Sequence, residues 1–279
     1  MINIYVILTT SSNLVVGLTN LLTMGQAAFY GIGAYVTALA LMVLGFSFLP
    51  ALILAMLVTG ILSLAIGIMS LRLKGDYFVL ATLGFQMIIY TLLYNWIAVT
   101  KGPYGISSIP GPLTFGVEIK GIYAFLIMSS VLGIVIVFIF SRLINSPFGR
   151  ALKGLRDDPI GMLTIGKNIT KLKIQAFVIA STFAAISGFI YATYITYIDP
   201  TSFSLDETLF IISALLIGGT GNIKGPIIGA IIVVLLPEIL RFVGLPDSFA
   251  ANLRMIIYGL CLIFMMFWRP QGIAGDYRI

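Results

Sequence analysis

A charged stretch from residue 146 to residue 168, SPFGRALKGLRDDPIGMLTIGKN, holds the side chains best suited to recognising a partner in this largely apolar sequence. Arg150, Lys153 and Asp157 follow at intervals of three and four residues, which places them on one face of a helix. Arg156 and Asp158 extend the same charged group. Ammonium, guanidinium and carboxylate groups of this kind bind by charge, so the chemistry expected here is recognition.

Proline, glycine and asparagine divide this stretch into two helices. Pro147 after Ser146 starts the first helix, Pro159 interrupts it, and Gly166 with Asn168 ends the second. Two readings are open and the residues favour neither. A rigid helical pair could pass force from a soluble partner to membrane spans, or a plain basic loop could lie against anionic lipid headgroups.

Polar residues inside the apolar runs form a second group of candidates. Ser11, Ser12 and Asn13 cluster in the first run, and Gln86 lies at four-residue spacing from Thr82 and Tyr90 along one face of the fourth run. Polar groups are costly in hydrocarbon and therefore face inward or a partner helix. They line a translocation path or make hydrogen bonds between helices, and the second alternative is favoured about two to one.

Glycines dominate a third candidate site, GGTGNIKGP at residues 218–226. The apolar run before it, residues 208–219, has only 12 residues, about 18 Å as a helix, too short to cross a bilayer comfortably, so a half-helix or re-entrant arm is expected. Unwound backbone at such depth is tolerated where it lines a cavity or is buried in protein. Gly218, Gly219, Gly221 and Asn222 therefore form a gate, or the glycines serve tight helix crossing.

Enzymatic chemistry is not expected. The chain has no histidine and one cysteine, and it shows no paired intramembrane carboxylates and no nucleophile with an evident base. It lacks the Gly-Lys-Ser/Thr ending of an ATP-binding loop, so ATP must be bound by another chain. We expect no cofactor and no metal. The net charge of +6 lies mostly in short gaps between apolar runs, which does not indicate nucleic-acid binding.

The elements that must position these groups are membrane-spanning helices. Hydrophobic residues make up 59% of the chain and charged residues 9%. The expected fold is an all-α polytopic transmembrane bundle in a single domain, residues 1–279, with about eight spans plus the short arm. The spans are expected at residues 3–20, 26–45, 50–71, 77–98, 121–142, 173–197, 226–243 and 252–268.

Positive residues set the expected orientation. The segment 143–172 is rich in Lys and Arg and is placed in the cytoplasm, together with the C-terminus. The turn-rich segment 99–120 is an external loop. The stretch between residues 197 and 208 holds Asp199, Asp206 and Glu207 and no Lys or Arg, as expected of a second external loop.

Three segments in the same order resemble a known family. The core GRALKGLRDD of the charged stretch looks like the cytoplasmic loop of LivM-type permeases of branched-chain amino acid ABC importers, and GLTNLLTMGQAAFYGIGAYV at 17–36 and IGGTGNIKGPIIGA at 217–230 agree with it. The resemblance covers about residues 17–272. The chain departs from the family where relatives commonly show Glu-Ala-Ala before the glycine, because it reads GMLTIG.

The resemblance implies a prokaryotic inner-membrane permease working by alternating access. It implies a second permease subunit, in a heterodimer, two cytoplasmic ATPase subunits and an external substrate-binding protein. The stretch from Arg150 to Gly166 would be the coupling element that docks on the ATPase. Substrates would be branched-chain amino acids, with other amino acids, amides or urea as alternatives. A secondary transporter or channel is a further alternative, which would more typically show a buried ionisable residue.

Overall fold

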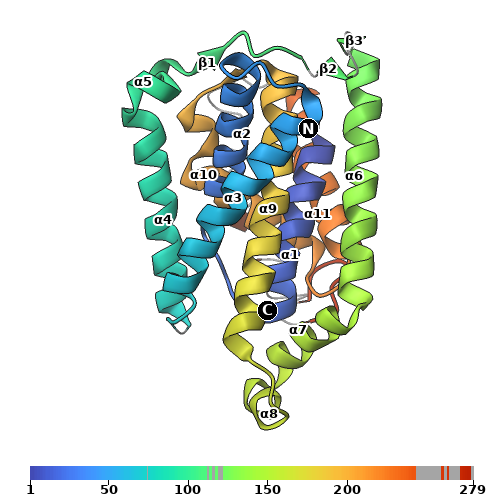
Figure 1. Cartoon of the computed structure of the whole chain (residues 1–279). Coiled ribbons are helices and arrows are strands. Elements are labelled where there is room, and N and C mark those ends of the chain that lie inside the picture. The colour runs from blue at the N-terminus through green and yellow to red at the C-terminus, as the bar shows by residue number, and fades with distance from the viewer. Residues whose placement is uncertain are drawn as a thin grey trace.

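The computed structural model describes residues 1–73, 75–111, 113–114, 117–118, 122–242, 259–260, 263 and 271–277. These residues form a helical bundle with short strands at one end (Figure 1). The longer helices are α1 (Ile2–Thr19), α2 (Gln26–Met42), α3 (Phe48–Ser70), α4 (Asp76–Asn95), α6 (Ile122–Asn145), α7 (Pro147–Asp157), α9 (Ile169–Ile195), α10 (Leu205–Gly218) and α11 (Lys224–Phe242). The short ones are α5 (Ile97–Thr100), η1 (Gly102–Tyr104), α8 (Pro159–Thr164) and η2 (Pro200–Phe203).

The all-α membrane architecture is confirmed, and the exact number of spans stays a prediction. Among the described residues, five helices are long and apolar enough to cross a bilayer, namely α1, α3, α4, α6 and α9. The helix α2 matches a further expected span but is shorter, and α11 matches another, with an apolar stretch at Lys224–Leu236. The last expected span, 252–268, lies outside the described residues except for helical residues 259–260 and 263.

Helix α9 lies at the centre of the bundle and packs against α1, α2 and α3. Its contact with α2 depends on small residues. A Cβ atom on Gly33 would lie 2.5 Å from the Cα of Ala185, and one on Gly188 would lie 2.3 Å from the carbonyl oxygen of Tyr30. Backbones approach this closely only without side-chain bulk, as is common between membrane helices.

The helices α3, α4 and α6 form the periphery and present apolar side chains outward. Ile61, Leu80 and Ile134 are 67%, 62% and 70% exposed in the isolated chain. Such a surface is unfavourable in water and suits contact with hydrocarbon or with another apolar helix. The distribution explains why composition alone identifies the protein as membrane-embedded.

The chain is not helical between α1 and α2, at residues 20–25. Side chains from other helices satisfy the opened backbone there. The hydroxyl oxygen of Thr82 in α4 accepts from the Met24 amide at 3.0 Å, and that of Thr208 in α10 accepts from the Ala27 amide at 3.2 Å. Buried backbone groups without such partners would each cost free energy comparable to a lost hydrogen bond.

The two ends of the bundle differ. One end carries α7, α8 and the C-terminal segment 271–277, and the other carries the strands (Figure 1). Strand β1 (Ile106–Ser107) pairs antiparallel with β4 (Tyr197–Ile198), and β2 (Leu113–Thr114) pairs with β3 (Val117–Glu118). The expected loop 99–120 thus contains only short elements among its described residues, and residues 112, 115–116 and 119–120 lie outside the description.

Candidate functional site

Local capping explains the two short helices of the charged stretch. The Ser146 hydroxyl accepts from the Gly149 amide at 3.3 Å at the start of α7. The carboxylate of Asp158 accepts from the amides of Ile160 and Gly161, each at 3.0 Å, at the start of α8. Side-chain oxygens at these positions satisfy amides that a helix leaves without partners. Gly166 follows α8 with φ +76°, a conformation that glycine adopts without strain.

Helix α7 is anchored to the bundle by its apolar face. Leu152 and Leu155 are buried, at 0% and 1% exposure, while Arg150, Asp157 and Asp158 are exposed and Lys153 is partly exposed. The Arg150 guanidinium donates to the carbonyl oxygen of Asn145, the last residue of the preceding helix α6, at 3.1 Å. The charged face expected from the spacing is therefore presented away from the bundle, apart from Arg156.

Arg156 turns into the bundle. Its guanidinium donates to the carbonyl oxygen of Gly17 and lies 3.4 Å from that of Val16, both at the end of α1. Its guanidinium carbon also lies 4.2 Å from the centre of the Tyr277 ring, a cation–π geometry. Burial lowers the pKa of the Arg156 guanidinium, and the nearby Tyr277 and Asp157 partly offset that effect.

The glycine loop, residues 218–225, joins α10 to α11 and is held by Asn13 of α1. The Asn13 amide nitrogen donates to the Asn222 carbonyl oxygen at 2.7 Å, and its carbonyl oxygen accepts from the Gly221 amide at 3.0 Å. Gly219 and Gly221 have φ values of +99° and +98°, which favour glycine. Asn222 in turn caps α11, because its side-chain oxygen accepts from the Gly225 amide at 2.9 Å.

The same loop brings α10 and α11 into close contact. A Cβ atom on Gly218 would lie 2.0 Å from the Gly225 carbonyl oxygen, and one on Gly229 would lie 1.9 Å from that of Ala214. The alternative of tight helix crossing is therefore present in the geometry. A gating role for Gly218, Gly219, Gly221 and Asn222 stays a prediction.

The C-terminal segment 271–277 completes this junction, and the sequence reasoning missed it. The amides of Ile273, Ala274 and Asp276 donate to the carbonyl oxygens of Ile217, Gly218 and Thr220, at 3.0, 2.9 and 2.9 Å. The carbonyl oxygens of Ile217 and Gly218 are the last two of α10, and carbonyl groups at a helix end have no partner within the helix. The Asn222 side chain reaches the carboxylate of Asp276 at 3.0 Å. We call the assembly of Asn13, Gly17, Arg156, the glycine loop and residues 271–277 the junction.

The remaining path candidates lie elsewhere and are buried. The Ser11 and Ser12 hydroxyls both donate to the Leu8 carbonyl oxygen of their own helix at 2.8 Å. Gln86 is 1% exposed and donates through its amide nitrogen to the Phe203 carbonyl oxygen at 2.8 Å. These contacts accord with packing. A role in translocation for the three residues stays a prediction.

The helix α10 begins at Leu205, three residues earlier than expected, and this moves Glu207 from the expected loop into a helix. Glu207 was expected in an external loop, but it lies in the first turn of α10, partly buried, and its carboxylate accepts from the Tyr5 hydroxyl at 2.8 Å. The helix was expected to begin at Thr208, one residue after Glu207. A small difference in where the helix begins therefore decides whether Glu207 belongs to a loop or to a helix. Among the described residues, no group of three or more possible metal ligands occurs.

Comparison with known proteins places the chain in a family. Residues 1–266 match the family described as "Branched-chain amino acid transport system / permease component". The LivM permease protein of the high-affinity branched-chain amino acid transport system from Salmonella typhimurium is 35% identical over 99% of this chain and 68% of its own length. A probable LivM of Methanocaldococcus jannaschii is 30% identical over 82% of this chain and 69% of its own length.

A more distant relative is named for a different substrate. The autoinducer 2 import system permease protein LsrC of Yersinia pseudotuberculosis is 26% identical over 91% of this chain and 72% of its own length. No solved structure matches the chain. Because the family match covers nearly the whole chain and the LivM identity exceeds 30%, the chain belongs to the family of permease components of branched-chain amino acid transport systems.

Proposed function

We propose that this chain is the membrane-spanning permease subunit of an ABC importer for branched-chain amino acids, located in a prokaryotic inner membrane. The observation that carries the proposal is the family match over residues 1–266 together with LivM identity over 99% of the chain. ATP is bound and hydrolysed by partner subunits, and the permease alternates between outward-open and inward-open states.

The α7–α8 loop is the element that meets the ATPase. It presents Arg150, Lys153 and Asp157 on one side, and the apolar residues Ile160, Leu163 and Ile165 at its tip are 74%, 58% and 66% exposed. Apolar groups exposed beside charges at the water-facing end of a membrane protein suit a protein partner. The chain reads GMLTIG at residues 161–166, where family members commonly show Glu-Ala-Ala before the glycine, so this contact is more apolar here.

The assembly contains a second permease subunit, two cytoplasmic ATPase subunits and an external substrate-binding protein, with the two permeases different from each other. The α7–α8 end and the C-terminus face the cytoplasm, and the β1–β4 end meets the binding protein. Arg156 of α7 contacts Tyr277 of the C-terminal segment, and this contact supports placing both segments on the same side of the membrane.

Reconstitution tests this function. The chain, its partner permease, ATPase and binding protein are placed in proteoliposomes with ATP on the ATPase side, and uptake of labelled leucine, isoleucine and valine is measured. We expect uptake that needs ATP and the binding protein. Uptake that persists without ATPase subunits would favour a secondary transporter or channel.

A second substrate class is favoured by one observation, the likeness to LsrC. LsrC is named for the import of autoinducer 2, so an assembly of this kind can serve a substrate other than a branched-chain amino acid, with other amino acids, amides or urea as the candidates. Binding of candidate solutes to the partner binding protein distinguishes these, because the affinity of that receptor selects what reaches the permease.

A further inference from the structure

The interior near the start of α10 contains a carboxylate surrounded by aromatic rings. The Glu207 carboxylate accepts from the Tyr5 hydroxyl and lies within electrostatic range of the hydroxyls of Tyr30 and Tyr191. Tyr5 also packs its ring 4.9 Å from that of Phe210. These residues come from α1, α2, α9 and α10, so the tertiary fold alone assembles the group.

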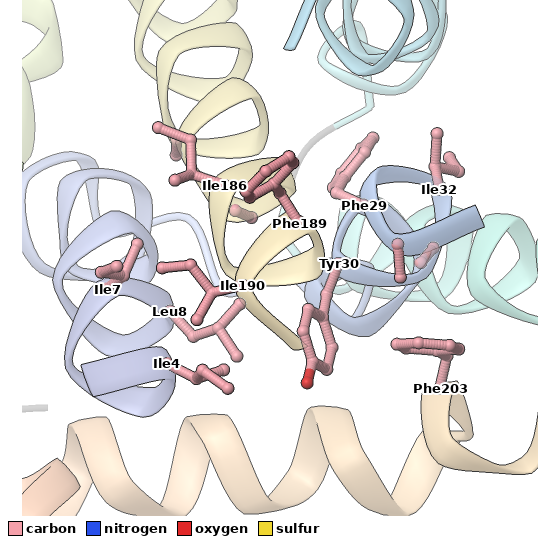
Figure 2. Close-up of a cluster of buried hydrophobic side chains, with 14 of the residues drawn as sticks. Ile4, Ile7, Leu8, Phe29, Tyr30, Ile32, Ile186, Phe189, Ile190 and Phe203 are labelled. Carbon is pink, nitrogen blue, oxygen red and sulfur yellow. The ribbon is translucent and has the colours of Figure 1, made fainter. Parts of the chain in front are cut away.

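Phe203 joins the rings on the side of η2. Its ring centre lies 4.9 Å from that of Tyr30 and 5.7 Å from that of Tyr191, both close to perpendicular. Figure 2 shows the Tyr30 hydroxyl directed toward α10, the helix that follows Phe203. Tyr30 and Phe203 are 2% and 1% exposed, so both rings lie inside the bundle.

Two buried polar side chains beside Phe203 have atoms without partners. Gln86, 1% exposed, donates to the Phe203 carbonyl oxygen, while its own side-chain oxygen has no hydrogen-bond partner among the described residues. The Tyr35 hydroxyl, whose ring lies 6.0 Å from that of Phe203, also has none in the part of the chain that the structure describes. A buried polar atom left unsatisfied costs roughly 1–3 kcal/mol, which points to a polar ligand absent from the isolated chain.

The chemistry of this group fits a cation with hydrogen-bond donors. A carboxylate supplies the opposite charge, aromatic faces attract cations, and the Gln86 side-chain oxygen accepts a hydrogen bond. Burying a carboxylate is costly unless it is paired, so a carboxylate inside the bundle is a candidate for a functional role. The transported amino acid carries such a cation, its protonated amino group.

We propose that Glu207, with the rings of Tyr5, Tyr30 and Tyr191, forms the subsite in this permease for the protonated amino group of the transported amino acid. The inference rests on the proposed function. Phe203 of η2 packs against Tyr30 and Tyr191 on one side of the subsite. Asp199 also acts electrostatically on Tyr191 and provides a second carboxylate on the side of β4.

A binding experiment without ATPase tests the subsite independently of transport. The full chain with its partner permease is purified in lipid nanodiscs, and ligand contact is measured by saturation-transfer NMR with three probes. Leucine carries both charged groups, leucinamide keeps the ammonium without the carboxylate, and 4-methylpentanoate keeps the carboxylate without the ammonium. We expect leucine and leucinamide to bind and 4-methylpentanoate to show at least about tenfold weaker signal.

Two variants separate charge from structure. Glu207→Gln keeps an acceptor for the Tyr5 hydroxyl but removes the charge, and it should abolish the preference for the ammonium probes. Tyr5→Phe removes the hydrogen bond but keeps the ring and the charge of Glu207, so it should weaken the preference for the ammonium probes far less than Glu207→Gln does. Asp206→Asn, at the exposed neighbouring position, is the matched control and should behave as the unaltered protein.

The subsite proposal is overturned if leucine and leucinamide fail to bind at all, if 4-methylpentanoate binds as well as leucinamide, or if Glu207→Gln leaves the preference intact. None of these outcomes depends on ATP. Failure of ATP-driven uptake in proteoliposomes would instead contradict the proposed function while ammonium binding persists.

Discussion

Arg156 in α7 donates from its guanidinium to the main-chain carbonyl oxygen of Gly17, near the end of α1. Gly17 lies against the glycine loop, because a Cβ atom there would come within 3.0 Å of the Gly221 amide nitrogen. A displacement of α7 therefore acts directly on α1 and on the loop between α10 and α11. Two residue groups that the sequence suggests for separate roles, coupling and gating, meet at this contact.

The first prediction concerns Arg156. Arg156→Gln removes a charged hydrogen-bond donor and the stacking on Tyr277, so motion of α7 reaches α1 less effectively. We expect leucine uptake per ATP hydrolysed to fall by about tenfold, within the usual range of coupling energies, while the ATPase still co-purifies. Uptake and ATPase rates in the same proteoliposomes provide the measurement. Unchanged stoichiometry would contradict a transmitting role.

Arg150 and Lys153 should behave differently, because their side chains point away from the bundle. Charge reversal to Glu at both positions places like charges against the proposed ATPase surface and should reduce ATPase co-purification by about tenfold or more. Lys171→Glu, at an exposed position in the first turn of α9, is the matched control and should retain the ATPase. Equal loss in the control would show a general charge effect.

The contact between α10 and α11 predicts a steric effect at Gly218. A methyl group there would lie 2.0 Å from the Gly225 carbonyl oxygen, so Gly218→Ala forces backbone displacement and should destabilise the protein by about 1–3 kcal/mol. Gly84→Ala in α4 is the control, because no atom of the described residues lies within 4 Å of its Cβ position. Thermal unfolding in detergent compares the two. A normal melting temperature for Gly218→Ala would contradict the close approach.

Asn13 is expected to stabilise the glycine loop. Asn13→Leu removes both hydrogen bonds to the loop and leaves the Gly221 amide without its partner, at a cost of roughly 1–3 kcal/mol. Ser12→Ala should cost much less, since the Ser12 hydroxyl bonds only within α1. Protease cleavage near residues 219–223 should rise in Asn13→Leu alone. Equal cleavage in both variants would place the loop's stability elsewhere.

Sidedness can be tested by labelling single cysteines in a Cys261→Ser background. Lys153→Cys in α7 should react with a membrane-impermeant maleimide only from the cytoplasmic side. Tyr104→Cys, at a position 84% exposed at the opposite end, should react only from outside. Labelling of Lys153→Cys from the exterior in intact cells would reverse the proposed orientation.

The sequence by itself determined the membrane class, most helices and the two short helices at residues 147–164. These follow from local rules, since apolar run length sets the spans and Pro, Ser, Asp and Gly at fixed offsets set the caps. The GRALKGLRDD and GGTGNIKGP segments also marked two parts of the junction, Arg156 and the glycine loop. Their family resemblance agrees with the match over residues 1–266.

Only the tertiary structure decided which of these residues meet. Arg156 and Arg150 are basic residues of the same short helix, and the sequence assigns them the same expected role. Arg156 nevertheless faces Gly17, because the buried Leu152 and Leu155 fix the rotation of α7. In the sequence Glu207 reads as a loop residue because the apolar run begins only at Thr208. No hydrophobic pattern shows that the helix extends back to Leu205. Contacts between residues separated by 139 or 202 positions depend on how helices pack, and helix packing is not encoded in any local pattern.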